Sequence, residues 1–94
     1  MLQDWEYPGR QGAGCNVVDT ANDANNLLKV FQELRAAMDK KYKNKELTSA
    51  VHVRTFQTAS GYMSSVKEYA KVLDRVNIMT YDINGGWNST TGTI

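Results

Sequence analysis

Apolar residues recur at steps of three and four through the middle of the chain, over about residues 22–42. Charged and amide side chains occupy most positions between them, so this segment predicts an amphipathic helix. A second apolar series of the same spacing predicts a shorter helix over about residues 64–73. The apolar positions of the two helices are Ala24, Leu27, Leu28, Phe31, Leu34 and Met38, followed by Met63, Val66, Tyr69, Ala70 and Leu73.

Three short stretches, residues 1–8, 47–53 and 76–81, are apolar, aromatic or β-branched and predict strands. They alternate with the two helices in the order strand, helix, strand, helix, strand. This alternation predicts an α/β fold, a βαβαβ unit with a parallel sheet and right-handed crossovers. Such connections occur both in doubly wound sheets and in eight-stranded barrels, and the pattern alone does not separate the two.

The chain has 94 residues, 41% of them hydrophobic and 22% charged, which predicts one globular domain over residues 1–94. No run approaches the ~18–20 apolar residues of a membrane span, so we expect no membrane segment. The single cysteine, Cys15, excludes an internal disulfide and a multi-cysteine metal site. No metal or other cofactor is expected.

Eleven basic and ten acidic residues give a formal net charge of +1, so no global field draws nucleic acid to the chain. Cations gather where a helix C-terminus carries partial negative charge. We therefore interpret the lysines after the long helix as solvated, rather than as a nucleic-acid patch, and no protein partner is implied. These lysines are Lys40, Lys41, Lys43 and Lys45.

Ligands of α/β folds bind at the carboxyl ends of the strands, so polar residues there are the first candidates. Asp4, Trp5 and Glu6 end the first predicted strand. Side chains alternate along a strand, so the two carboxylates share a side and lie about 7 Å apart, given the ~3.3 Å rise per residue. This arrangement suits acid–base chemistry; the alternative is that both carboxylates are merely solvated.

The third predicted strand ends in Met79, Thr80, Tyr81 and Asp82. Met79 and Tyr81 share a face, and Tyr81 could place a hydroxyl donor beside the carboxylates of the first strand. The alternative is a core methionine and an edge tyrosine. Trp87, which follows two glycines, could stack on a sugar ring or cover apolar surface.

The motif Asp4-Trp5-Glu6-Tyr7-Pro8, together with Met79-Thr80-Tyr81-Asp82, resembles glycoside hydrolase family 18, the chitinase family. The loop at residues 9–15 and the run at residues 19–23 resemble the fungal members of that family. The resemblance extends over nearly the whole chain. It implies the (β/α)8 TIM barrel fold, of which this chain would hold strands four to six and helices four and five.

The resemblance also implies a role for each strand-end residue. In the family, the Glu that matches Glu6 protonates the glycosidic oxygen. The Asp that matches Asp4 orients the N-acetyl group of the substrate, whose carbonyl oxygen attacks the anomeric carbon, so no second protein nucleophile is needed. The Tyr that matches Tyr81 hydrogen-bonds this acetamido group, and the Asp that matches Asp82 contacts sugar hydroxyls. Further expected substrate contacts are Tyr7, Met79 and Trp87.

Two positions depart from the family. Its signature reads Asp-x-x-Asp-x-Asp-x-Glu, and the middle Asp aligns with Leu2 here, while the first would precede Met1. That middle carboxylate normally shares a proton with the one that matches Asp4. His52 stands where the family usually has a small residue or proline; we interpret it as structural, with a new acid–base group as the alternative.

We therefore expect a chitinase fragment whose parent performs retaining, endo-type hydrolysis of β-1,4-linked N-acetylglucosamine polymers. The implied partners are chitin or N-acetylglucosamine oligosaccharides. The chain alone is expected to be inactive, because a three-stranded piece has two open edges and lacks most walls of the cleft. Its inward sheet face, with Val51, Ile78 and Met79, would also lose the facing layers that fill a barrel.

The alternative hypothesis is a catalytically silent, lectin-like module that binds chitin oligosaccharides. Such a module needs only stacking residues such as Trp5 and Trp87, whereas hydrolysis requires Glu6. The residues at the start of the chain lack the basic and apolar regions of a signal peptide. The location of the protein stays open, although the family is often secreted.

Overall fold

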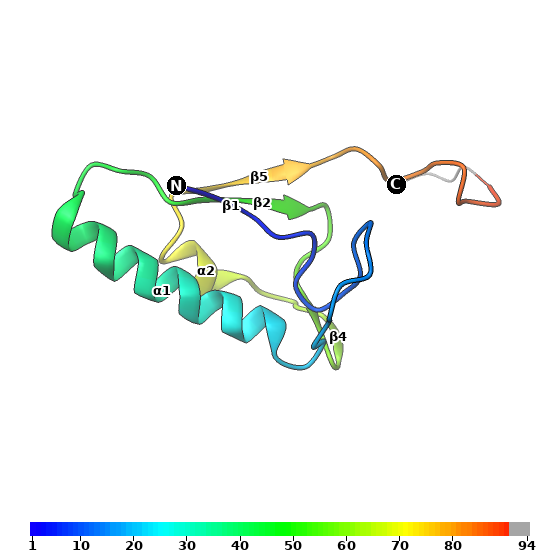
Figure 1. Cartoon of the computed structure of the whole chain (residues 1–94), viewed down its shortest axis with the longest axis horizontal. Coiled ribbons are helices and arrows are strands. Elements are labelled where there is room, and N and C mark those ends of the chain that lie inside the picture. The colour runs from blue at the N-terminus through cyan, green and yellow to red at the C-terminus, as the bar shows by residue number, and fades with distance from the viewer. Residues whose placement is uncertain (91–94) are drawn as a thin grey trace.

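A computed structural model describes residues 1–90 of the chain. Three strands form a parallel sheet in the order β1-β2-β5, where β1 is Leu2–Asp4, β2 is Thr48–His52 and β5 is Arg75–Met79. Figure 1 shows both helices below this sheet, on one of its two faces. Each strand lies beside the next strand of this sheet along the chain, which occurs in α/β barrels and in one half of a doubly wound sheet. The predicted strand–helix alternation is confirmed.

The register of the sheet determines which residues reach the same edge. Asp4 pairs with Ala50, Ala50 pairs with Asn77, and His52 pairs with Met79. Paired residues in a parallel sheet point to the same face, as do residues two apart on one strand. Asp4, His52 and Met79 therefore lie on one face, at or near the carboxyl ends of their strands.

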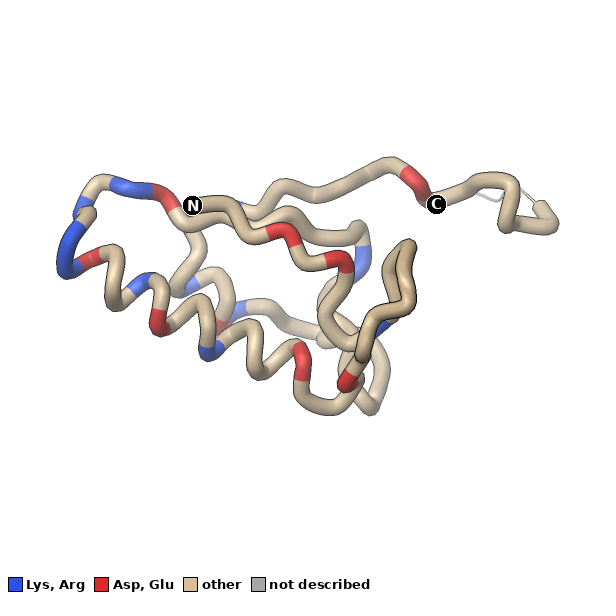
Figure 2. The backbone as a smooth tube through the Cα atoms, viewed as in Figure 1, with Lys and Arg blue, Asp and Glu red and all other residues tan. Residues whose placement is uncertain are grey.

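Helix α1 spans Asp23–Lys41, within one residue of each predicted end. Lys40 and Lys41 lie in its last turn, where their charges face the negative end of the helix dipole. Figure 2 shows this basic end of α1 on the side of the molecule opposite the carboxyl ends of the strands. The buried positions of α1 form a single stripe along the helix: Ala24, Leu27, Phe31 and Met38.

Helix α2 is shorter than predicted: it spans Lys67–Ala70, a single turn, rather than residues 64–73. The residues after it form a tight turn, in which the N–H groups of Val72 and Leu73 both donate to the carbonyl of Tyr69, at 3.1 and 3.0 Å. Leu73 is nevertheless buried, as its apolar spacing indicated. The helix stops early because the chain must reach the start of β5 two residues beyond Leu73.

A hairpin that the sequence did not predict lies between β2 and α2. Its strands are β3, Gln57–Thr58, and β4, Gly61–Tyr62, which pair antiparallel. Strands of two residues are too short to produce a recognisable alternation of apolar and polar positions. The hairpin matters for the site because Gln57 lies against the loop that follows β1.

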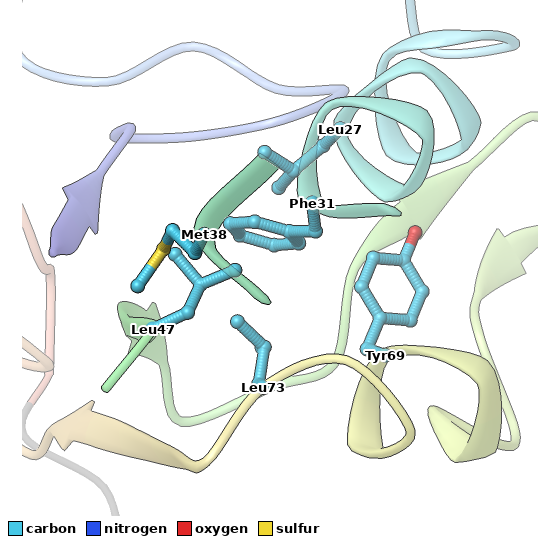
Figure 3. Close-up of a cluster of buried hydrophobic side chains, with 6 residues drawn as sticks. All are labelled: Leu27, Phe31, Met38, Leu47, Tyr69 and Leu73. Carbon is cyan, nitrogen blue, oxygen red and sulfur yellow. The ribbon is translucent and has the colours of Figure 1, made fainter. Parts of the chain in front are cut away.

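The hydrophobic core lies between α1, the start of β2 and the segment that contains α2 (Figure 3). Phe31 and Leu47 are fully buried, and the rings of Phe31 and Tyr69 meet edge to face with centroids 6.4 Å apart. Trp5 and Phe56 pack against this cluster from outside. Its six members are Leu27, Phe31, Met38, Leu47, Tyr69 and Leu73.

The structure corrects the expectation that Val51, Ile78 and Met79 share one face of the sheet. Val51 pairs with Ile78, whereas Met79 pairs with His52 one residue further on. A strand reverses the direction of its side chains at each residue, so Met79 points to the face opposite Val51 and Ile78. Val51 and Ile78 instead line a hollow of about 380 Å³ together with Tyr69, on the side of the helices. The expected grouping of all three on the inward face is therefore wrong.

Asp74 joins the starts of β2 and β5 to α1. Its backbone N–H donates to the carbonyl of Leu47 at 2.9 Å, and the N–H of Leu47 donates back to Asp74 Oδ2 at 2.7 Å. Arg35 of α1 forms an ion pair with the same carboxylate, and its Nε donates to the carbonyl of Val72 at 2.9 Å. The amide of Leu47, followed by the guanidinium of Arg35, lowers the pKa of Asp74 below its usual value.

The loop between β1 and α1 is closed at both ends by Asp23, the first residue of α1. Asp23 Oδ2 accepts hydrogen bonds from the N–H groups of Gly9, at 3.1 Å, and Asp19, at 3.0 Å. Gly9 has a φ of +76°, and a Cβ at this position would lie 2.6 Å from the carbonyl oxygen of Gln57. Both the dihedral and the close approach require glycine at position 9.

The middle of this loop packs on the backbone of Glu6. Gln11 and Asn16 exchange two hydrogen bonds, at 2.6 and 3.1 Å, and Asn16 Nδ2 donates to the carbonyl of Glu6 at 3.5 Å. A Cβ at Gly12 would lie only 2.1 Å from that same carbonyl oxygen. The position of Glu6 therefore depends on the absence of a side chain at residue 12.

We predict that Gly12→Ala displaces either the loop or Glu6, because the added methyl group would overlap a backbone carbonyl. Overpacking of this kind costs about 1–3 kcal/mol of unfolding free energy. Gly14→Ala is the matched control, since a Cβ at position 14 would meet its nearest atom at 3.7 Å, an ordinary contact. Urea unfolding measures the stability, and the amide chemical shifts of Glu6 and Tyr7 report the displacement. Equal effects of the two substitutions would contradict the prediction.

We also predict that the chain loses stability between about pH 10 and pH 12. Burial raises the pKa of Tyr69 from 10.0 to about 12, and its hydroxyl donates to the carbonyl of Ala24 at 2.6 Å. The unfolded chain therefore releases this proton at a lower pH than the folded chain, so unfolding becomes easier as the pH rises through this range.

Tyr69→Phe should lower the unfolding free energy near neutral pH by about 0.5–1.5 kcal/mol, through loss of the buried hydrogen bond, and should flatten the alkaline decline. Tyr42→Phe is the control, because the Tyr42 side chain is 51% exposed. Urea unfolding at a series of pH values, followed by circular dichroism, measures both effects. An unchanged alkaline slope in the Tyr69→Phe variant would refute the assignment.

Candidate functional site

The carboxyl end of β1 carries two exposed carboxylates. Asp4 is the last residue of β1, and both Asp4 and Glu6 are exposed, whereas Trp5 between them is partly buried against the core. This division agrees with the alternation that the sequence predicted. The peptide bond between Glu6 and Tyr7 is cis. The motif thus uses one side chain for packing and leaves two acids free for solvent or a ligand.

The end of β5 lies beside the end of β2. Because β5 ends at Met79, the second motif, residues 79–82, is divided between the strand and the loop that follows it. Met79 is the last residue of β5 and is buried, with 6% of its surface exposed. The strand stops two residues before the predicted end, so Tyr81 and Asp82 lie in the segment that follows it. Tyr81 is 63% exposed, and Asp82 adopts a φ of +52°. Met79 is therefore held by the sheet, while Tyr81 and Asp82 belong to the loop above it.

An open hollow of about 590 Å³ lies beyond the carboxyl ends of β2 and β5. It brings Asp82 and Trp87 together, although Asp4, Glu6, Met79 and Tyr81 are not among the residues that line it. Trp87 is 70% exposed, and its ring lies over Gly85, where a Cβ would come within 2.4 Å of the indole. Residues that line the hollow include Arg10, His52, Arg54, Asp82, Asn84 and Trp87.

Sequence reasoning missed a cluster of arginines and aromatic rings at this edge. The Arg10 guanidinium lies 4.2 Å from the centroid of the Tyr7 ring, and the Arg54 guanidinium lies 5.3 Å from that of Tyr62. Tyr7 and His52 meet edge to face at 5.4 Å. The sequence did contain one indication: Arg10 and Arg54 each follow shortly after a strand, β1 or β2, and so could be expected near the carboxyl edge of the sheet. The contact of Arg10 with Tyr7 is local, within the turn in which the N–H of Arg10 donates to the carbonyl of Tyr7 at 3.3 Å. The contacts of Tyr7 with His52 and of Arg54 with Tyr62 arise only when β1, β2 and the hairpin come together.

Burial, the two arginines and Glu6 each shift the pKa values of this cluster. Burial, followed by the charges of Arg10 and Arg54, lowers the pKa of His52 below 6.5. Burial alone would raise the pKa of Tyr62, but the two guanidinium groups outweigh it and hold the pKa below 10.0. At Tyr7, burial and the neighbouring Glu6 carboxylate together raise the pKa. The site therefore has an acidic part at Glu6 and a basic part at the arginines, with Tyr7 between them.

His52 has a structural contact in this cluster. Its Nδ1 accepts a hydrogen bond from the backbone N–H of Arg54 at 3.1 Å, and its ring packs on Tyr7. Both contacts agree with the structural interpretation of this histidine. Within residues 1–90, no three His, Cys, Asp or Glu side chains group closely enough to hold a metal ion. The helices of this described part are too short or too polar to span a bilayer.

Comparison with known proteins gives consistent matches. A chitinase-like effector of Moniliophthora roreri is 38% identical over 90 residues, which cover 95% of this chain and 21% of that protein. An endochitinase of Manduca sexta is 38% identical over 84 residues, covering 89% of this chain and 14% of the relative. A chitinase of Autographa californica nuclear polyhedrosis virus is 34% identical over 91 residues, covering 93% of this chain and 16% of the relative.

No solved structure gives a significant match to this chain. The chain spans about a fifth or less of the length of each of these three relatives. The sequence model of the family described as glycosyl hydrolases family 18 matches residues 3–94, which include both strand-end motifs. The fold of that family is the eight-stranded α/β barrel, and the parallel order of β1, β2 and β5 agrees with it. On this evidence, the chain belongs to glycosyl hydrolase family 18.

Proposed function

We propose that this chain carries the proton donor of a family 18 chitinase, and that Glu6 is that donor. The observation that supports the proposal is the exposure of Asp4 and Glu6 at the carboxyl edge of a parallel sheet, on either side of a Trp5 that packs on the core. Ligands of α/β barrels bind at this edge. Relatives named as an endochitinase and a chitinase match the chain over 89% and 93% of its length.

In the proposed reaction, Glu6 donates its proton to the glycosidic oxygen as the bond to the leaving sugar breaks. The carbonyl oxygen of the substrate's own N-acetyl group attacks the anomeric carbon, and water later opens the resulting ring with Glu6 as the base. Configuration is therefore retained without a protein nucleophile. The intermediate carries positive charge, which the Asp4 carboxylate would stabilise.

The remaining expected contacts divide between the sheet and the loops. Met79 is held by β5 at the edge of the site, and Tyr7 is fixed by contact with His52 and Arg10. Tyr81, as the donor to the acetamido group, and Asp82, as a contact for sugar hydroxyls, lie in the exposed segment after β5. Trp87 presents a largely exposed ring that suits stacking on a sugar.

We further propose that β1, β2 and β5 correspond to strands four to six of the barrel. The substrate of the whole enzyme would be chitin or N-acetylglucosamine oligosaccharides, cleaved within the chain. Five further strands and their loops would supply the other walls of the cleft. Binding energy from those walls would hold the distorted sugar ring next to Glu6.

A second candidate function is chitin binding without hydrolysis. It is favoured by Leu2, which stands where the family signature has a carboxylate and which shares a face of β1 with Asp4. Asp4 therefore lacks the neighbour that shares its proton in the family. The relative from Moniliophthora roreri, whose name describes a chitinase-like effector, matches 95% of this chain. The two functions differ in whether Glu6 is needed.

We predict that Glu6→Gln, in a complete family 18 barrel that contains this segment, lowers the hydrolysis of a fluorogenic chitin oligosaccharide by about 10²–10⁴-fold while binding is retained. The amide keeps the shape of the side chain but delivers no proton. Glu68→Gln is the control, because Glu68 is exposed on α2 and pairs only with Lys71 among the described residues. Tyr81→Phe should cost less than Glu6→Gln, since the acid stays in place. Hydrolysis unchanged by Glu6→Gln would disprove the role of Glu6.

We also predict that residues 1–94 alone do not hydrolyse chitin oligosaccharides and self-associate in solution. Val76 and Ile78 on β5 are 47% and 56% exposed, and the outer edges of β1 and β5 are unpaired among residues 1–90. Such edges pair readily with other chains. Sedimentation and an assay on the same fluorogenic substrate measure the two properties. A monodisperse, hydrolytically active monomer would contradict both expectations.

A further inference from the structure

The basic part of the site contains two guanidinium groups that are held in place but have no carboxylate partner within residues 1–90. Arg10 and Arg54 stack on Tyr7 and Tyr62, at 4.2 and 5.3 Å from the ring centroids. The salt bridges of the described residues involve other cations, namely Arg35, Lys71 and Arg75. Stacking restricts the orientation of a guanidinium and leaves its N–H groups at the rim available to a ligand.

His52 adds a third donor to the same hollow. Because its Nδ1 accepts the backbone N–H of Arg54, the neutral imidazole carries its proton on Nε2. Arg10, His52 and Arg54 all line the hollow of about 590 Å³ beyond β2 and β5. Three side chains that carry hydrogen-bond donors therefore line one open space.

The acidic groups around these donors do not neutralise them. Asp82 lines the same hollow and Glu6 lies beside Tyr7, yet neither carboxylate lies within 4.0 Å of an arginine nitrogen in the described chain. Burial lowers the pKa of His52, and the charges of Arg10 and Arg54 lower it further. The same two guanidinium groups hold the pKa of Tyr62 below 10.0 against its burial, so their positive charge acts on the groups around them.

We infer that Arg10, Arg54 and His52 form a binding site for an oxyanion, that is, a carboxylate or phosphate group. Such a group offers several acceptor oxygens to guanidinium donors, and hydrogen bonds between charged partners are the stronger ones. The source could be a free phosphate ion or an acidic group carried on a sugar, since both present the same chemistry. The site requires neither Glu6 nor Asp4, so it goes beyond the proposed hydrolysis and can be tested without it.

The test is equilibrium dialysis of the chain against radiolabelled inorganic phosphate at low ionic strength, a method that does not require a monomeric sample. We expect Arg10→Gln and Arg54→Gln each to weaken phosphate binding by about tenfold or more, since a charge-assisted hydrogen bond contributes about 1.5–3 kcal/mol. Arg75→Gln is the matched control, because Arg75 pairs with Glu46 at the start of β5. It should change phosphate binding less than twofold, because Arg75 begins β5 and does not line the hollow beyond the other end of that strand.

Competition against the label then distinguishes the sources. Glucuronic acid and N-acetylglucosamine 6-phosphate should displace phosphate at much lower concentration than neutral N-acetylglucosamine, which lacks the oxyanion. Displacement by the acidic sugars at much lower concentration than by unlabelled phosphate would assign the site to a saccharide. Absence of phosphate binding, or equal weakening by Arg75→Gln, would overturn the inference. Either result would leave the role of Glu6 unaffected, because hydrolysis is not the measured quantity.

Discussion

The reciprocal pair of hydrogen bonds between Asp74 and Leu47 is the constraint on which the rest of the structure depends. It sits one residue before the first paired positions of β2 and β5 and therefore sets their register. A slip of one residue would send every side chain of β5 to the other face. His52 and Met79 would then no longer share a face at the edge of the sheet. The ion pair of Arg35 with Asp74 extends the same constraint to α1.

The site is built from two parts of opposite charge that depend on different elements. The acids Asp4 and Glu6 belong to β1, and the loop that packs on Glu6 is tied to the first residue of α1. The bases lie on segments that leave β1 and β2, and they rest on Tyr7 and on the hairpin residue Tyr62. Tyr7 lies next to Glu6 and packs against Arg10, so a displacement of its ring would affect both parts.

The sequence predicted most of the fold and the exposure of both carboxylates at the end of β1. The apolar stripe of α1, the three strands and the motif around Glu6 each have a local signature. The hairpin and the shortness of α2 could not be predicted, because two-residue strands lack a period and the turn after Tyr69 is imposed by the route to β5. The contact of Tyr7 with His52 was also inaccessible, since it depends on β1 and β2, which are distant in the sequence. The exposed position of Tyr81 was not predicted either, because β5 ends two residues earlier than its composition indicates.

The double acceptor role of Asp23 has a consequence for how this region can evolve. Since one carboxylate oxygen holds both Gly9 and Asp19, the nine residues between them form a closed ring on the surface of the domain. Insertions or deletions within such a ring leave the strand before it and the helix after it in their places. Apart from Gly12, which leaves room for the carbonyl of Glu6, relatives can therefore vary the length and composition of this segment without rebuilding the scaffold beneath it.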